Sequence, residues 1–131
     1  LEAWVTRNPY AQAGLYGQCT WFAWGRFYEL YGYDPGFSGD GSSCVKELVA
    51  AHPNKFERSS SPKAGAVFSA IGHNHVGIVI AVKDNTITVQ EGNLDGITNT
   101  FQDAKKDWQT KSYTLDQLRS IYGGVVFANP K

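Results

Sequence analysis

The sequence has no excess of either charge and no cluster of one sign, since 12 Lys and Arg residues balance 12 Asp and Glu residues over 131 positions. Proteins that bind nucleic acid or anionic membranes through their charge carry a basic run or stripe, and this chain has none. It also has no apolar stretch near the roughly 20 residues that span a bilayer. The sequence therefore predicts neither a nucleic-acid partner nor a membrane partner.

Cysteine is scarce. Cys19 and Cys44 are the only two, and no Cys-x-x-Cys pair supports a redox function. Two cysteines are compatible with one disulfide in an exported protein, or with one reactive thiol and one inert thiol. The two alternatives exclude each other because a disulfide would silence Cys19 as a nucleophile. We interpret Cys44 as a packing residue at the start of a helix.

The composition is that of a compact, mixed domain. Hydrophobic residues make up 42% of the chain, aromatics 14%, and glycine occurs 14 times. A chain of this length can bury one core without staples, so we expect residues 1–131 to form a single domain. Residues 1–4 do not resemble a signal peptide, and we expect the numbering to begin inside a longer chain or after processing.

The first half of the chain predicts helices. Apolar residues recur at helical spacing from Cys19 to Tyr31, and Gly32 ends the run. A second helix is expected from Ser43, and Pro53 forbids its continuation. The remaining segments of this half are predicted to be irregular: an extended arm and turn over residues 1–16, and loops over 33–41 and 54–64.

From Gly65 the apolar pattern changes to a period of two, which predicts an antiparallel meander. The expected strands cover residues 66–70, 75–82, 86–90, 96–102 and 125–128. Residues 75–82 are apolar on both faces, so this strand should be central. Thr114 and Gln117 have the spacing of a capping box and predict a short helix to about Ile121.

Cys19 is the candidate nucleophile because it occupies the first turn of the first predicted helix. Unpaired backbone N–H groups and the positive end of the helix dipole favour a thiolate there and can hold an oxyanion. The alternative is that Cys19 is a small apolar side chain in a core, as buried free cysteines often are.

A nucleophilic thiol needs a base and a group that orients the base. Of the three histidines, His52 ends a predicted surface helix and His73 lies in a turn, whereas His75 begins the central strand beside Gly77. A structural role for His75 is the alternative. Directly after the next strand, Glu91 and Asn93 lie two positions apart and should therefore share a face.

The hairpin between these strands decides whether His75 and Glu91 can meet. A two-residue turn at 84–85 would pair Glu91 with Ile78 and put His75 on the opposite face. A three-residue loop at 83–85 would place Gly77 opposite Glu91 and His75 opposite Asn93. A catalytic role therefore requires an odd-length connection or a bulge, and we predict one. Otherwise Glu91 and Asn93 are ordinary polar residues at a loop edge.

Four blocks of the sequence together resemble the CHAP family, the cysteine, histidine-dependent amidohydrolases and peptidases of papain-like fold. The blocks are Gln18–Ala23, Gly65–Phe68, His75–Val79 and Glu91–Asn93, and the resemblance runs from about Asn8 to Asn129. It implies an α+β fold in which N-terminal helices pack on an antiparallel sheet or half-barrel.

By this resemblance Cys19 is the nucleophile, His75 the general base, and Glu91 and Asn93 the groups that orient and support the imidazole. Gln18 would contribute to the oxyanion hole with the backbone N–H of Cys19. The resemblance implies no cofactor. Some members carry an aspartate-rich calcium loop before the cysteine, but residues 8–18 contain no carboxylate, so we predict no metal site. Ala66 stands where the family more often has an acidic residue, which we interpret as structural variation.

The implied activity is hydrolysis of an amide bond in bacterial peptidoglycan, as an endopeptidase or an N-acetylmuramoyl-L-alanine amidase. We expect an extracellular or cell-wall location, a monomer, and further domains in the same chain for wall targeting. A phage lysin, a bacterial autolysin and a conjugation-associated protein all fit. The alternative from another class is a non-catalytic wall-binding or structural module with a Cys19–Cys44 disulfide.

Overall fold

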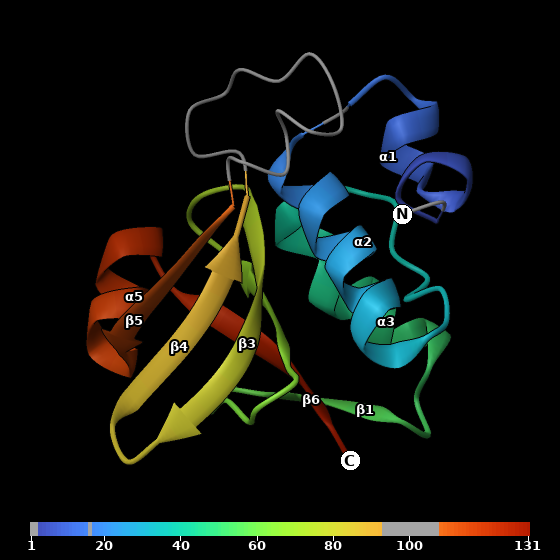
Figure 1. Ribbon diagram of the computed structural model, residues 1–131. Helices are drawn as coiled ribbons and strands as arrows, with labels where there is room; N and C mark the ends of the chain where they lie inside the picture. The colour runs from blue at the N-terminus through green and yellow to red at the C-terminus, as the bar shows by residue number, and fades with distance from the viewer. Residues whose placement is uncertain (1–2, 16, 93–107) are drawn as a thin grey trace.

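The computed structural model describes residues 3–15, 17–92 and 108–131. Short helices come first in the chain, most of the strands follow, and one helix precedes the last strand (Figure 1). The helical elements are η1 (Ala3–Arg7), α1 (Pro9–Gln12), α2 (Cys19–Tyr31), η2 (Gly41–Ser43), α3 (Cys44–Ala51) and α5 (Leu115–Tyr122). The strands are β1 (Phe56–Ser59), β2 (Val67–Ala70), β3 (His75–Lys83), β4 (Thr86–Glu91), β5 (Gln109–Thr114) and β6 (Val125–Pro130).

The six strands form one antiparallel sheet in the order β1-β6-β2-β3-β4-β5. Helices α2 and α3 lie on one side of the sheet, and α5 packs beside β5 and β6 away from them (Figure 1). The predicted α+β class is therefore confirmed. Strand β3 has a neighbour on each side, which confirms its predicted central place.

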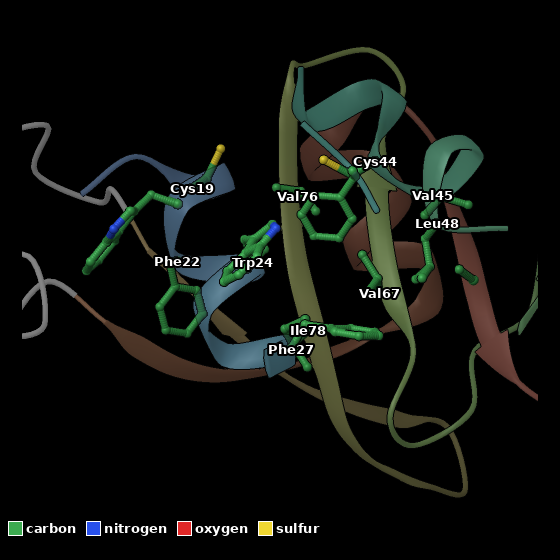
Figure 2. Close-up of a cluster of buried hydrophobic side chains, with 14 of the residues drawn as sticks. Cys19, Phe22, Trp24, Phe27, Cys44, Val45, Leu48, Val67, Val76 and Ile78 are labelled. Carbon is green, nitrogen blue, oxygen red and sulfur yellow. The ribbon is translucent and has the colours of Figure 1, made fainter. Parts of the chain in front are cut away.

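Each face of the sheet has its own apolar cluster. The cluster under α2 and α3 contains Phe22, Trp24, Phe27, Leu48, Val76 and Ile78, several of which Figure 2 shows. The cluster toward α5 contains Phe68, Val79, Val89, Leu118 and Phe127. Each fully buried side chain of this size contributes about 1.5–3 kcal/mol to stability. The first cluster holds the helix that begins at Cys19 against the strand that begins at His75.

Helix α2 has the predicted bounds, Cys19–Tyr31, and ends as the sequence indicates. Gly32 adopts the left-handed conformation with a φ of 79°, and its N–H donates to the Tyr28 carbonyl oxygen. A side chain at that φ would be strained, which is why glycine ends the helix here. Helix α3 begins at Cys44 after a short 3-10 turn and ends at Ala51, two residues before Pro53.

The prediction of an extended arm over residues 1–16 is wrong, because η1 and α1 lie there. The Asn8 side chain accepts a hydrogen bond from the Tyr10 N–H at 3.0 Å, and Pro9 occupies the first helical position. Asn8 Nδ2 also donates to the Trp21 carbonyl oxygen at 2.9 Å. The second bond is a tertiary contact with α2, so the local sequence gave only part of the signal.

Two edge strands were also missed. The predicted loop over 54–64 contains β1, and β5 lies in a stretch for which the sequence predicted no element. Both strands have one hydrogen-bonded neighbour and largely exposed side chains, so they lack the apolar alternation that identifies interior strands. The strand predicted over 96–102 falls outside the described residues. The predicted capping box is confirmed: the Gln117 N–H donates to Thr114 Oγ1, and the Thr114 N–H donates to Gln117 Oε1.

The β3–β4 hairpin meets the predicted requirement by a bulge. Its turn has two residues, Asp84 and Asn85, so the three-residue loop considered in the sequence analysis is wrong. The residue numbers of two paired residues show the register. Near the turn they add up to 169, as for Val82 and Ile87, whereas farther along Ile78 pairs with Gln90, which gives 168. The register shifts at Ile80. If the pairing of Ile78 with Gln90 continues by one residue, Gly77 lies opposite Glu91. Glu91 is then on the face of the sheet that His75 shares.

Candidate active site

Cys19 is the first residue of α2 and is 8% exposed. Gln18 caps the helix through its backbone only, and the first bond within the helix runs from the Phe22 N–H to the Gln18 carbonyl oxygen at 3.0 Å. The N–H of Cys19 precedes that bond, among the first-turn groups that have no partner within a helix. The thiol therefore lies beside donors that can stabilise negative charge.

A cavity of about 140 Å³ opens beside the thiol. Gln18, Cys19 and Thr20 form its α2 side, and Tyr10, Leu15, Ser38, Gly39, Asp40, Gly41 and Asn74 complete the lining. Asp40 is the only charged residue among them. Cys19, although largely buried, therefore borders a cavity.

His75, the first residue of β3, connects Cys19 to Glu91. Its Nε2 lies 2.8 Å from Glu91 Oε1, and its side chain is 15% exposed. Burial lowers the pKa of His75, but hydrogen bonds to Cys19 and Glu91 and their negative charges outweigh burial and raise the pKa from 6.5 to about 9. The imidazole is therefore a cation at neutral pH, with Nε2 donating to Glu91 and the other ring nitrogen available to the Cys19 sulfur.

Glu91 ends β4 and has no exposed surface. Its Oε1 accepts hydrogen bonds from His75 and from the Tyr122 hydroxyl, and its Oε2 accepts one from the Tyr113 hydroxyl at 3.3 Å. Burial raises the pKa of Glu91, but these bonds and the nearby imidazolium hold it below its usual value. The carboxylate is therefore ionised and hydrogen-bonded at both oxygens.

Tyr113 and Tyr122 belong to the site, although sequence reasoning missed them. The Tyr122 ring stacks on the His75 ring at a centroid distance of 4.8 Å and an interplanar angle of 17°. Strand alternation explains the contact, because His75 shares its face with Gly77 and Val79, and Val79 packs in the cluster of α5. The sequence carried no local motif for either tyrosine, since only the packing of α5 on this face brings them in.

Glycines let three backbones approach the site. The missing side chain of Gly77 leaves room for Phe68. A Cβ at Gly77 would lie 2.5 Å from Phe68 Cε2. A Cβ at Gly41 would lie 2.7 Å from the His75 carbonyl carbon, and one at Gly92 would lie 2.6 Å from Phe22 Cβ. These contacts fix the positions of β3, η2 and α2 relative to one another.

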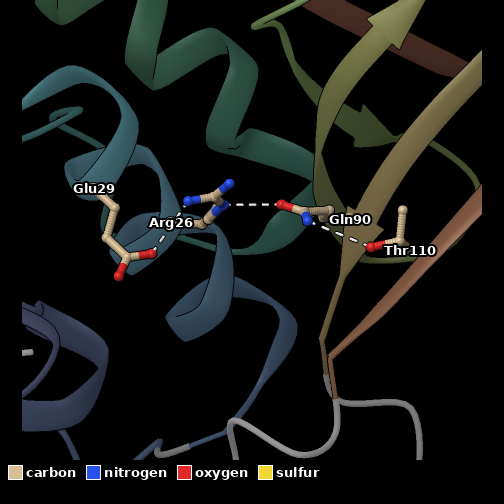
Figure 3. Close-up of polar contacts among 4 residues, drawn as sticks. All are labelled: Arg26, Glu29, Gln90 and Thr110. Carbon is tan, nitrogen blue, oxygen red and sulfur yellow. Dashed lines mark hydrogen bonds and ion pairs between the residues drawn. The ribbon is translucent and has the colours of Figure 1, made fainter.

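A polar link ties α2 to the strands beside the site (Figure 3). Arg26 Nε donates to Gln90 Oε1 at 2.8 Å, and Gln90 Nε2 donates to Thr110 Oγ1 at 3.4 Å. Arg26 also pairs with Glu29 at 3.4 Å within α2. Gln90 precedes Glu91, so the link connects the helix of the nucleophile to the strand of the carboxylate.

Both cysteines are free thiols, so the structure lacks the alternative Cys19–Cys44 disulfide. Cys44 is fully buried at the start of α3, which confirms its predicted packing role (Figure 2). Its Sγ donates to the Asp40 carbonyl oxygen at 3.3 Å and lies 3.8 Å from the Tyr10 hydroxyl. Burial raises the pKa of Cys44 well above its ordinary value, which keeps this thiol protonated.

Gln18 lies on the cavity beside Cys19, whereas Asn93 falls outside the described residues. His52 Nε2 bonds the Asp34 carbonyl oxygen, and His73 is exposed in the turn before β3.

Within residues 3–15, 17–92 and 108–131, no group of three or more His, Cys, Asp or Glu side chains could hold a metal ion. No helix in those ranges is long and apolar enough to cross a membrane.

Comparisons with known proteins identify a family from the sequence and similar folds among solved structures. The sequence pattern of the CHAP domain matches residues 7–93. Among solved structures, an N-acetylmuramoyl-L-alanine amidase from Staphylococcus aureus is similar with a TM-score of 0.58 and 20% identity, over 88% of this chain and 31% of that one. Ly7917 is similar with a TM-score of 0.56 and 19% identity, over 87% of this chain and 53% of that one. The chain thus spans about a third to a half of these proteins. No curated protein matches.

Proposed function

Because the chain belongs to the CHAP domain family, we propose that it hydrolyses an amide bond of bacterial peptidoglycan with Cys19 as the nucleophile. The observation that carries the proposal is the hydrogen-bonded His75–Glu91 pair beside a thiol at a helix start. A strand histidine with a purely structural role needs neither a buried carboxylate at 2.8 Å nor contact with a thiol. The combination is that of a nucleophile, a base and an orienting group.

The chemistry follows from the positions of the groups. The Cys19 thiolate attacks the carbonyl carbon of the amide, and the oxygen becomes an anion held by the N–H of Cys19, with Gln18 the second candidate donor. The imidazolium of His75 then donates its proton to the leaving amine, and a thioester to Cys19 remains. Water, deprotonated by the now neutral His75, attacks the thioester carbonyl carbon, and cleavage of the C–S bond releases the acid and regenerates the thiolate–imidazolium pair. Glu91 keeps the ring oriented and stabilises its charge through both steps.

The similar structures support this substrate class. One is an N-acetylmuramoyl-L-alanine amidase, and another is Ly7917, which has also been crystallised with the hydrolyzing product of MDP. Two bonds remain candidates for this chain: the link between the sugar and the first L-alanine, and a peptide bond in the stem or cross-bridge. We propose that the protein acts outside the cell or in the wall, as a monomeric catalytic module accompanied by wall-targeting domains.

The test is mass spectrometry of the soluble fragments released from purified Gram-positive peptidoglycan. Wild type, Cys19→Ala and Cys44→Ala should be compared, since Cys44 is a buried thiol that the mechanism does not use. We expect release by wild type and Cys44→Ala and none by Cys19→Ala. Free peptides that begin with L-alanine would identify an amidase, and new amino ends within the stem or bridge an endopeptidase. Equal release by Cys19→Ala, or no release from several wall types, would overturn the proposal.

A further inference from the structure

The β5–α5 unit contributes two phenols to the site, from a part of the chain that the family pattern does not reach. Tyr113 lies near the end of β5, Tyr122 is the last residue of α5, and the match to the family ends at residue 93. Both hydroxyls donate to Glu91, each to a different oxygen. Of the two tyrosines, it is Tyr122 that also contacts the His75 ring.

We propose that Tyr122 is a positioning residue for the Cys19–His75 pair, acting through its hydroxyl on Glu91 and through its ring on His75. Tyr113 supports the same carboxylate more weakly. This inference rests on the proposed function, because it assigns a role in the reaction of Cys19.

The hydroxyl acts on the charge of Glu91. A buried carboxylate accepts hydrogen bonds only and is costly to keep ionised without donors. Oε1 is shared by Tyr122 and His75, so removal of the Tyr122 hydroxyl leaves that oxygen with the imidazole alone. Among the described residues, the titratable groups that face Glu91 are His75 from β3, Tyr113 from β5 and Tyr122 from α5. Loss of one of three donors should therefore make Glu91 easier to protonate.

The ring acts on the orientation of His75. A nearly parallel stack at 4.8 Å covers one face of the imidazole, and Phe68 approaches it at 5.9 Å with a tilt of 55°. Proton transfer between sulfur and imidazole needs a fixed ring plane, because small misplacements of reacting groups are costly in rate. The Tyr122 ring removes the freedom of the imidazole to turn away from Cys19.

Backbone contacts fix Tyr122 relative to His75. Gly123 ends α5 in the left-handed conformation with a φ of 67°, and the Ile71 N–H donates to the Gly124 carbonyl oxygen at 2.9 Å. A Cβ at Gly72 would lie 2.9 Å from Gly123 Cα. The end of α5 is thus packed directly against the turn that leads into His75, and the stack does not depend on a long flexible side chain.

A merely structural role for Tyr122 can be separated from a positioning role with three variants. Tyr122→Phe keeps the ring and the stack but removes the hydroxyl. Tyr113→Phe removes the longer bond to Oε2. Tyr28→Phe is the matched control, because the Tyr28 hydroxyl accepts from Arg7 and has no contact with Glu91.

The readout is the pKa of Glu91 from its side-chain carboxyl carbon, followed by ¹³C NMR across the acid range. We expect the pKa of Glu91 to rise by about one unit in Tyr122→Phe, as the loss of a hydrogen bond to a charged group implies. The rise should be smaller in Tyr113→Phe and absent in Tyr28→Phe. An unchanged Glu91 titration in Tyr122→Phe would overturn the inference.

The second readout is the rate at which iodoacetamide alkylates Cys19 at neutral pH. In Tyr122→Phe, which keeps the stack, this rate should stay close to that of wild type. In Tyr122→Leu, which also removes the stack, the rate should fall about tenfold in protein that remains folded by circular dichroism. A Tyr122→Leu rate equal to that of wild type would overturn the role of the ring. Neither readout uses peptidoglycan, so a wrong substrate assignment and a wrong role for Tyr122 give distinguishable results.

Discussion

His75 Nε2 and Glu91 Oε1 lie 2.8 Å apart at the ends of two adjacent strands, and the carboxylate has no exposed surface. A pair of this kind keeps the imidazole protonated to a higher pH than that of an ordinary histidine. Loss of the proton would leave a buried carboxylate without its cationic partner. In the proposed reaction this proton is the one that His75 gives to the leaving amine.

The first prediction concerns the two thiols. In native protein iodoacetamide should modify Cys19, at the cavity, whereas Cys44 should react only after unfolding because it is fully buried and its pKa is raised. Mass spectrometry should therefore find one label per native chain and two per denatured chain. Absence of any free thiol in unreduced protein would instead support the disulfide of a non-catalytic module.

The second prediction concerns activity at high pH. Activity should fall as pH rises through about 9, where His75 loses its proton. In Glu91→Gln the neutral amide no longer favours the imidazolium, so the pKa of His75 should drop and the fall should begin at lower pH. The measurement is the initial rate of fragment release against pH. Glu29→Gln, which alters a carboxylate paired with Arg26 on α2, should keep the wild-type profile. A Glu91→Gln profile identical to that of wild type would contradict the assignment.

The third prediction concerns stability. The pKa of His75 is raised on folding, so its contribution is fully present below the unfolded value of 6.5 and is lost as pH rises through about 9. A rise of that size corresponds to about 3 kcal/mol at most. The pKa of Glu91 is lowered, so its contribution is present above the unfolded value of 4.5 and is lost as pH falls through the folded pKa. Urea unfolding should give a free energy that declines between pH 6.5 and 9, and His75→Gln should flatten that decline.

The elements that sequence reasoning found are those with a strong local signal. The apolar period of α2, its glycine cap and the capping box of α5 are encoded within the elements themselves. Edge strands β1 and β5 are not encoded locally, because apolar and polar residues alternate little along them and their pairing depends on distant parts of the chain. The short helices before α2 depend in part on a bond from Asn8 to Trp21, which only the folded chain provides.

The site divides in the same way. Cys19, His75 and Glu91 were predicted from their places on a helix start and two strands, and the structure brings them together. For the hairpin of β3 and β4, the sequence predicted only that an odd-length connection or a bulge was needed. A run of β-branched residues does not reveal that Ile80 is the bulged residue. Tyr113 and Tyr122 had no signal, since their relation to Glu91 arises from the packing of α5 on a face that the sequence analysis did not connect with Cys19.

The last prediction tests the close packing behind His75. Gly77→Ala should destabilise the protein by about 1–3 kcal/mol, because its Cβ would lie 2.5 Å from Phe68 Cε2 and 3.0 Å from the Gln90 carbonyl oxygen. Any relief requires Phe68 to move, and Phe68 borders both the His75 and Tyr122 rings, so activity should fall as well. Val82→Thr, at an exposed position of the same strand, should change the unfolding free energy by less than about 0.5 kcal/mol. Thermal and urea unfolding measure both variants, and wild-type stability of Gly77→Ala would mean that Phe68 does not pack against this strand as described.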